Sequence, residues 1–436
     1  MKKTLGILLA AAMLAAALAG CGGGAASASV PAGNPGPAPA STPAADPVQL
    51  SFFGFKTGGE IGALEELIAK FNAENPDIVV SYEGLSNGGG YQDVLTTRLA
   101  SGQGDDVFLA NPNYLGKLQE AGYVEDLAGM AVVSNYSDLV KDLMTIDGKV
   151  PGLAMELAVF GMYTNNDVLK AHGIGAPTNY AEFMAACETL KAAGVTPVVA
   201  SAKDGTGIGV FNSTKGLDGL YSAPDKAAQI AAINEGTQSL AETMIDGLEL
   251  VSELKAKGYI NAEQAMVMAP AQDDITEFVK GNTAFMTGGG WSLAAIQEAA
   301  PGADITLGGV PVQEKDALVM VNAGVRVCIN KSCENKEAAQ RFVEFLTKTE
   351  NLDEYVASQN AFTPLKDGTS TSNPAMAAAA ERISAGRMIT WVDPAFSKLD
   401  PWALSKEYAA NILGGSSVET AVKDMNTAVA NAIKLA

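Results

Sequence analysis

From residue 48 onward, short apolar strands alternate with amphipathic helices, and this alternation constrains the fold more than any other feature of the sequence. Residues 49–55 and 78–82 have the composition of strands, and between them residues 64–71 place apolar side chains at helical spacing. This order is typical of α/β folds. Because residues 48–436 are more than one hydrophobic core usually holds, we expect two α/β lobes. The same patterning predicts a strand over 106–110 and helices over 91–100, 181–193, 336–349 and 417–435.

Residues 1–20 have the composition of an export signal. A start with two lysines is followed by an apolar run that ends at Leu18, with small residues before Cys21. The run is too short to span a bilayer, which favours a cleavable signal peptide. Leu18-Ala19-Gly20-Cys21 resembles the lipobox of bacterial lipoproteins, and this resemblance implies that Cys21 becomes a lipidated N-terminus. The alternative is an ordinary signal peptide with a chance cysteine.

Residues 21–47 carry this cysteine and then consist almost entirely of Gly, Ala, Ser, Pro and Thr. Such a composition cannot bury a core and predicts a disordered tether. A flexible tether would keep a soluble domain near the membrane and leave it free to turn. The expected location is therefore the extracellular side of the cell membrane, with a lipid anchor.

The charge of the chain limits its partners. A formal net charge of −20 disfavours binding to nucleic acid and to anionic lipid surfaces. After the signal no apolar run is long enough to span a bilayer. Membrane attachment is therefore expected only through the lipid on Cys21.

The few cysteines and the single histidine argue against a metal site and a disulfide framework. Besides Cys21, Cys187 lies among apolar residues of a predicted helix, and Cys328 and Cys333 lie in and just after a predicted strand. His172 is the one histidine, and no cysteine pair has the spacing of a zinc site. We expect no metal and no cofactor.

Several short motifs occur in a fixed order along the chain. They are LSFF at 50–53, KFNAENPDI at 70–78, LASG at 99–102 with DDV at 105–107, DGKV at 147–150, YTNND at 163–167, and FVKGNTAFM at 278–286 with GGW at 289–291. In this order the chain resembles the extracellular solute-binding proteins of ABC importers, specifically the carbohydrate-binding family that includes maltose-binding protein. Two positions depart from the family pattern: Asp105 replaces a proline, and Thr164 stands where a second tyrosine is common.

The resemblance implies two α/β lobes joined by crossing segments, with the ligand in the cleft between the lobes. The implied crossings lie near residues 155–159, 321–324 and 363–371. The implied first lobe comprises residues 48–156 and 322–366, and the second comprises residues 157–321 and 367–436.

The function that this resemblance implies is binding rather than catalysis. A lipid-anchored monomer would capture a small carbohydrate and deliver it to the permease subunits of an ABC transporter. Its mechanism would be closure of the lobes around the ligand.

Carbohydrate binding needs flat aromatic rings against the C–H faces of the sugar and polar groups that pair with its hydroxyls. Trp291 follows three glycines that allow a ligand to approach the backbone. Other candidates follow predicted strands, whose carboxyl ends bind ligands in open α/β sheets. The candidate ligand-binding residues are Phe53, Phe55, Lys56, Asn111, Asn113, Lys203, Asp204, Gly290, Trp291, Asn322, Arg326, Trp391 and Trp402.

Several of these candidates also have a purely structural explanation. Any of the tryptophans could be a core residue, and asparagines near Pro112 could serve to form a turn. Arg326 could belong to a structural ion pair. These alternatives stay open at the level of the sequence.

Two other functions remain possible from the sequence alone. A binding protein for another polar solute, such as glycerol phosphate, would need clustered cations, for which Lys56, Lys203 and Arg326 are the candidates. A secreted serine hydrolase could use Ser86, because residues 84–88 match G-x-S-x-G, but its base would have to be His172. Residues 205–209 do not complete the dinucleotide-binding glycine motif, so no nucleotide is expected.

The lipid anchor can be tested directly. Cys21→Ser removes the thiol that would carry the lipid, so the protein should move from the detergent phase to the aqueous phase in detergent phase separation, or remain unprocessed. The wild-type chain is the control. Equal partitioning of the two proteins would contradict lipidation at Cys21.

Overall fold

The computed structural model describes residues 46–87, 90–367 and 373–435. These residues belong to one compact unit that begins at Asp46. The predicted signal peptide, Cys21 and nearly all of the predicted tether lie outside the described residues. So does the end of the predicted third crossing, from residue 368 onward.

The first of two sheets has the strand order β2-β1-β3-β10-β4. Its strands are β1 (Val48–Gly54), β2 (Ile78–Gly84), β3 (Val107–Ala110), β4 (Leu153–Ala154) and β10 (Arg326–Ile329). β1 runs parallel to β2 and β3, whereas β10 runs antiparallel to β3 and β4. The carboxyl ends of β1, β2 and β3 therefore meet at one edge of this sheet.

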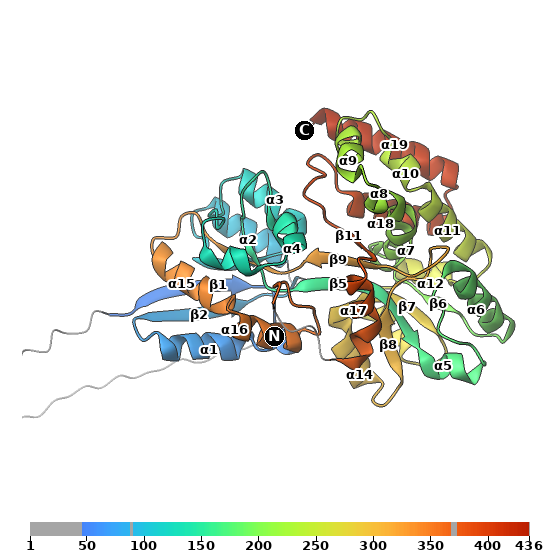
Figure 1. Ribbon diagram of the computed structural model, residues 1–436, viewed down its shortest axis with the longest axis horizontal. Coiled ribbons are helices and arrows are strands. Elements are labelled where there is room, and N and C mark those ends of the chain that lie inside the picture. Colours follow the sequence, from blue (N-terminus) through green and yellow to red (C-terminus); the bar gives the residue numbers. More distant parts are fainter. Residues whose placement is uncertain (1–45, 88–89, 368–372, 436) are drawn as a thin grey trace, which may run out of the picture. The chain divides into compact units, whose positions relative to one another are not determined.

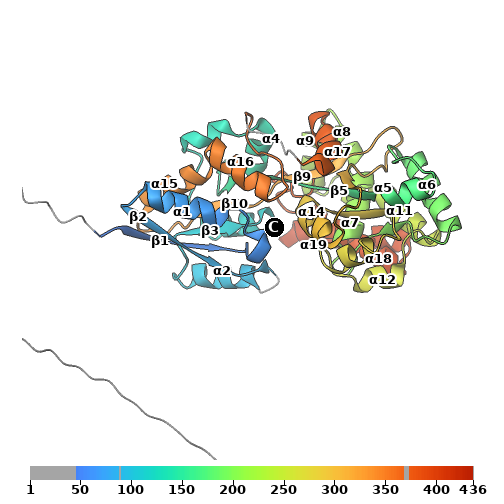
Figure 2. The same cartoon turned by 90° about the horizontal axis from the view of Figure 1, so that it is seen from below.

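Helices cover both faces of the first sheet (Figure 1). Figure 2 shows α1 (Leu64–Glu74) and α15 (Lys336–Leu346) on one face and α2 (Tyr91–Ala100) on the other. Neighbouring residues of β1 point to opposite faces, as a strand requires. The Phe52 ring packs edge-on against Phe342 of α15 at 5.4 Å, and the Phe53 ring lies 4.6 Å from Tyr91 of α2.

The second sheet has the order β11-β9-β5-β7-β6, and β8 also pairs with β5. Its strands are β5 (Leu157–Asn165), β6 (Val198–Val199), β7 (Phe285–Gly289), β8 (Ile305–Gly308), β9 (Val319–Ala323) and β11 (Met388–Thr390). β5 is buried along its whole length. The surrounding helices include α6 (Tyr180–Ala192), α7 (Thr206–Gly216), α11 (Ile245–Ala256), α18 (Pro401–Gly414) and α19 (Val418–Leu435).

Two chain segments connect the sheets as one antiparallel ribbon, which we call the connecting ribbon (residues 153–160 and 320–327). Its register runs unbroken from Leu153↔Val327 in the first sheet to Phe160↔Met320 in the second. Between the sheets the pairing continues, because Gly324 N–H donates to the Glu156 carbonyl at 2.9 Å. The next crossing segment, around Phe362, adds a bridge to Leu157.

The predicted elements are largely confirmed. The strands and the helices at 91–100, 181–193 and 417–435 lie within a few residues of their predicted bounds. For the helix predicted over 336–349, the predicted C-terminal boundary is wrong. The helix stops at Leu346, and α16 (Thr349–Ser358) starts after Lys348, whose extended backbone interrupts the helix. Cys187 and Cys328 are buried in the predicted helix and strand.

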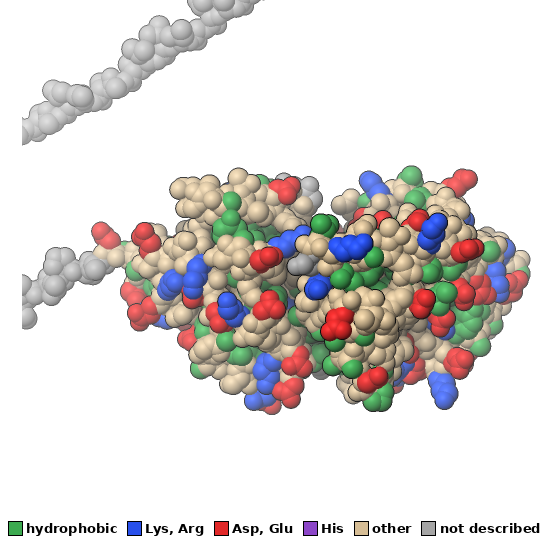
Figure 3. Space-filling view, turned by 90° about the horizontal axis from the view of Figure 1, so that it is seen from above, with side chains coloured by type: hydrophobic (Ala, Val, Ile, Leu, Met, Phe, Trp, Pro, Cys, Tyr) green, Lys and Arg blue, Asp and Glu red, His purple; other side chains and the backbone are tan. Residues whose placement is uncertain are grey.

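The described surface carries the acidic character of the sequence. Figure 3 shows Asp and Glu side chains distributed over the visible face, in keeping with the net charge of −20. Within the described ranges, no helix is both long enough and apolar enough to cross a membrane.

Candidate functional site

The first-sheet candidates lie at the carboxyl edge of the parallel strands. Lys56 follows β1 and is buried, and its Nζ donates to Gln359 Oε1 at 2.7 Å. The rings of Phe53 and Phe55 are also buried, and both contact Tyr91. These two phenylalanines therefore pack against α2, and Lys56 is the polar group at this strand end.

Two asparagines follow β3 at the same edge. Asn111 precedes α3 (Pro112–Glu120) in an extended conformation, and its side chain does not cap the helix. Asn113 lies in the first turn of α3 and is exposed. The chain turns from β3 into α3 at Pro112, and the amide side chains of Asn111 and Asn113 lie at this strand end.

All three tryptophans of the chain converge on one phenylalanine of the second sheet. The Phe160 ring lies 4.9 Å from Trp291 and 5.0 Å from Trp391, both edge-on, and 5.6 Å from Trp402. Edge-to-face contacts at these distances are favourable and fix ring orientation. We call these four side chains the aromatic group.

The members of the aromatic group differ in exposure. Phe160 and Trp402 are 5% and 9% exposed, Trp391 is half-buried, and Trp291 is 41% exposed. Phe160 and Trp402 therefore form a buried base, and Trp291 presents its ring at the surface. An exposed indole held by buried rings is suited to stacking on an apolar ligand face.

Backbone groups hold the Trp291 ring in place. A Cβ atom at Gly289 would lie 2.3 Å from the indole, so the ring can occupy this position only beside glycine. The hydroxyl of Tyr163, on β5, donates to the Gly289 carbonyl at 2.7 Å. Gly290 is buried, with Val159 and the Asn360 carbonyl close to it.

Asn322 and Arg326 lie on the connecting ribbon. Asn322 Nδ2 donates to the Val392 carbonyl at 2.9 Å, which fixes the loop that carries Trp391. Arg326 is 2% exposed, and its Nε and one terminal nitrogen donate to the carbonyls of Ala323 and Leu143. Burial lowers the pKa of Arg326 to about 10. Both side chains thus make contacts to the main chain.

Lys203 and Asp204 lie in an exposed turn before α7. The Asp204 carboxylate accepts from the Thr206 amide at 3.0 Å and from the Thr206 hydroxyl at 2.8 Å. These bonds stabilise the start of α7. The structure thus brings Gly290, Trp291, Trp391 and Trp402 together, while Lys203 and Asp204 lie on a separate turn.

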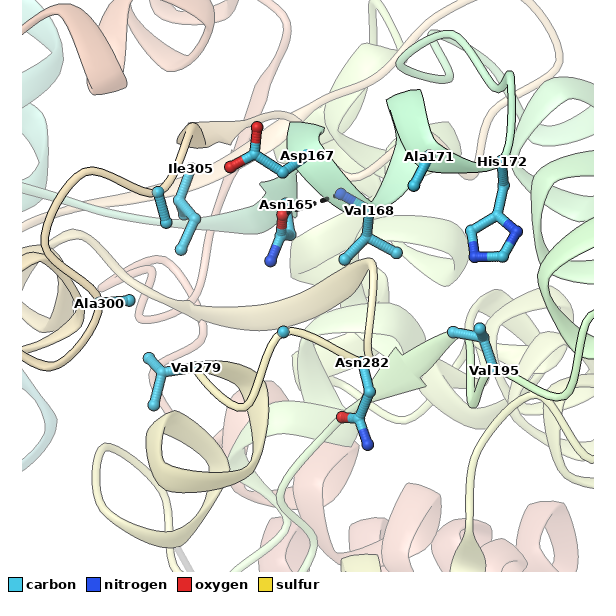
Figure 4. Close-up of a pocket in the computed structure, with 12 residues that line it drawn as sticks. Asn165, Asp167, Val168, Ala171, His172, Val195, Val279, Asn282, Ala300 and Ile305 are labelled. Carbon is cyan, nitrogen blue, oxygen red and sulfur yellow. Dashed lines mark hydrogen bonds between the residues drawn. The ribbon is translucent and has the colours of Figure 1, made fainter.

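His172 lines a pocket of about 420 Å³ beside α5 (Asn166–Ala171) (Figure 4). Asp167, Asn282 and apolar residues such as Val168 complete its walls. Ser86, which follows β2 of the first sheet, is not among the residues that line this pocket. The chain's single histidine, His172, thus lines a pocket to which Ser86 does not contribute.

Phe160 is the site residue that the sequence did not reveal. It lies in a continuous apolar strand, where a phenylalanine looks like any core residue. Its contacts join positions 291, 391 and 402, which are far apart along the chain. No local pattern could have shown this convergence.

Comparison with known proteins identifies the family to which this chain belongs. Residues 57–352, more than half of the chain, match the family described as bacterial extracellular solute-binding protein. The chain belongs to this family. The family predicted from the ordered motifs is confirmed, and the hydrolase alternative based on Ser86 is wrong, because the matched proteins bind solutes and are not enzymes.

Individual relatives agree with this family and with the fold. The multiple sugar-binding protein of Streptococcus mutans is 24% identical over 318 residues, which cover 71% of this chain and 73% of the relative. RafE from Streptococcus pneumoniae, in its apo form, has a TM-score of 0.73 at 20% identity over 89% of this chain and 98% of its own. A chitin oligosaccharide binding protein has a TM-score of 0.72 at 20% identity over 89% and 100%. The two-lobe α/β fold is confirmed.

The role of Phe160 can be tested by its replacement with leucine. Phe160→Leu removes the ring against which three indoles pack, so near-ultraviolet circular dichroism and acrylamide quenching of tryptophan should both change. The expected loss of stability is about 1 kcal/mol. Phe285→Leu is the matched control, because Phe285 is an equally buried phenylalanine on β7 whose ring packs against Phe183. Identical tryptophan signals in the two variants would contradict the grouping.

Proposed function

We propose that this protein captures a carbohydrate outside the cytoplasm and delivers it to the permease of an ABC importer. The observation that carries this proposal is the aromatic group, in which an indole exposed by 41% is held by buried rings. Such a surface matches the apolar face of a pyranose. The names of the relatives support a sugar: one binds multiple sugars, one binds chitin oligosaccharides, and RafE has been solved in complex with raffinose.

The proposed site lies between the lobes, with the aromatic group on the second lobe and the carboxyl edge of the first sheet opposite. We assign residues 48–156 and 322–366 to the first lobe and residues 157–321 and 367–436 to the second. Binding would close the lobes by bending of the crossing segments. The lipid on Cys21 would keep this monomer near its permease.

The positions of the cations disfavour glycerol phosphate as the ligand. A phosphate site needs donors that converge on one anion. Lys56 donates to Gln359 and two nitrogens of Arg326 donate to main-chain carbonyls, whereas Lys203 lies on an exposed turn. A neutral carbohydrate fits these residues better.

A sugar panel tests the proposed function. Raffinose, maltotriose, xylotriose and chitotriose are added separately to the soluble domain, and its melting temperature is measured. A bound sugar at 100 times its dissociation constant should add about 2.7 kcal/mol of stability. Small-angle scattering of the same samples should show a smaller radius of gyration with the stabilising sugar. No stabilisation by any carbohydrate, with stabilisation by glycerol phosphate, would contradict the proposal.

Trp291 should contribute to affinity more than to stability. Loss of its exposed ring in Trp291→Ala should weaken binding about 30-fold, or about 2 kcal/mol, in calorimetry with the sugar that binds. The melting temperature without ligand should fall only slightly, because the indole is 41% exposed.

Trp402→Ala provides the contrast, since Trp402 is 9% exposed. Its loss should lower stability by about 3–5 kcal/mol, as for other buried aromatic side chains. A large loss of stability in Trp291→Ala, with unchanged affinity, would assign Trp291 to the core.

A further inference from the structure

Trp391 lies in a loop whose conformation decides where the indole is presented. We call residues 390–396 the tryptophan loop; it starts at the last residue of β11 and ends at Phe396, which is buried. The indole is half-buried and packs edge-on against Phe160 at 5.0 Å. Apart from this ring contact, the position of the indole depends on the side chains that hold the loop.

The Tyr221 hydroxyl contacts the tryptophan loop on both sides of Trp391. Tyr221 lies on α8 (Asp218–Ser222), and its hydroxyl oxygen is 2.7 Å from Thr390 Oγ1 and 3.1 Å from Asp393 Oδ2. A carboxylate has no hydrogen to give, so the phenol donates to Asp393 and accepts from the Thr390 hydroxyl. Burial and then the charge of Asp393 raise the pKa of Tyr221, so the phenol keeps the hydrogen that this chain of bonds requires.

The helix that carries this hydroxyl is itself held firmly. Arg387, just before β11, forms an ion pair with Asp218 at the start of α8. The next helix, α9 (Lys226–Asn234), is anchored by Ile230, which is buried in the core around the second sheet. A side chain on a rigid support keeps its own position, so Tyr221 can impose a position on the loop that it contacts.

α9 adds two further contacts to the tryptophan loop. The Lys226 ammonium lies 5.0 Å from the centre of the Tyr221 ring and 3.9 Å from Asp393 Oδ2. At the other end of α9, Asn234 Nδ2 donates to the Ala395 carbonyl at 2.7 Å. The lysine side chain is exposed, and an ion pair in water contributes little. The Tyr221 hydroxyl is therefore the contact from these helices that bears most directly on the indole.

We propose that Tyr221 is a positioning residue for ligand binding and that it acts through the Trp391 indole. This inference rests on the proposed function. By holding Thr390 and Asp393, the hydroxyl keeps the loop on either side of the indole in one conformation before the ligand arrives. A ring that is already ordered loses less conformational freedom on binding, so this order raises affinity without a new contact to the ligand.

Tyr221→Phe tests this role because it removes the hydroxyl and keeps the ring. Calorimetry with the sugar that stabilises the wild type should show affinity about fivefold weaker, since the loop must then be ordered during binding. Thr390→Val breaks the same bond from the other side, keeps the shape of its side chain and should weaken binding in the same way. This second variant carries the test where the phenylalanine variant does not fold.

Tyr180→Phe is the matched control in the same half of the protein. The Tyr180 hydroxyl also donates to a carboxylate, that of Glu253, and its ring also lies near an ammonium, that of Lys215 at 5.2 Å. Neither partner belongs to the tryptophan loop. The control variant loses the same atoms from a similar environment and should bind the sugar like the wild type.

A double-mutant cycle shows whether Tyr221 acts through Trp391. Trp391→Ala should weaken binding, and in its background Tyr221→Phe should change affinity by less than about twofold, because the indole that it positions is absent. Without sugar, Tyr221→Phe should increase the quenching of tryptophan fluorescence by acrylamide. This increase should be absent when Trp391 is replaced by phenylalanine.

The outcomes separate the two proposals. A wild-type protein that binds no sugar in the panel overturns the proposed function, and this inference with it. A wild type that binds, with a Tyr221→Phe variant of equal affinity, overturns only the role of Tyr221. An equal loss of affinity with and without the Trp391 indole has the same consequence. A lower melting temperature with unchanged affinity and quenching would make the Tyr221 hydroxyl a stabilising group alone.

Discussion

The unbroken register of the connecting ribbon is the constraint on which the rest of this structure depends. Leu153↔Val327 belongs to the first sheet and Phe160↔Met320 to the second. Both ladders keep the same residue offset, and the Gly324 amide bond to the Glu156 carbonyl lies between them. Because side chains in a ladder alternate with period two, this register decides which residues point to each face. A slip of one residue would turn Phe160 away from the tryptophans and exchange the positions of Glu156 and Leu157.

The aromatic group shows how this register brings distant side chains together. Phe160 contacts three indoles, one from the 3-10 turn η4 (Gly290–Ser292) after β7, one from the loop after β11 and one from α18. Each contact is a small contribution, but together they orient Trp291 with its ring exposed. The Asn322 amide secures the loop of Trp391 from the same ribbon. One pair of strands, β5 and β9, thus carries both Phe160, which contacts the three indoles, and Asn322, which holds the loop of Trp391.

The parts of the fold that depend on local patterning could be predicted from the sequence. The helix at 91–100 and the strand at 78–82 follow from the spacing of apolar residues, whereas the break at Lys348 depends on tertiary context that spacing does not contain. The glycines before Trp291 indicate it as a candidate ligand-binding residue, and this assignment stays a prediction. Phe160 could not be singled out, because its position among the tryptophans depends on contacts with residues more than a hundred positions away.

Several buried polar groups on or beside the connecting ribbon have no hydrogen-bond partner among the described residues. On or beside the connecting ribbon, Asn322 Oδ1, one Arg326 nitrogen and the Tyr355 hydroxyl are buried without a hydrogen bond to a described residue. Each such group costs about 1–3 kcal/mol, which the cores of the two sheets must offset. A change of conformation that gives such groups hydrogen-bond partners removes this free-energy cost. A segment whose polar groups are already hydrogen-bonded gains nothing of this kind. A conformation or a bound polar group that gave these atoms hydrogen bonds would therefore lower the free energy of this part of the protein.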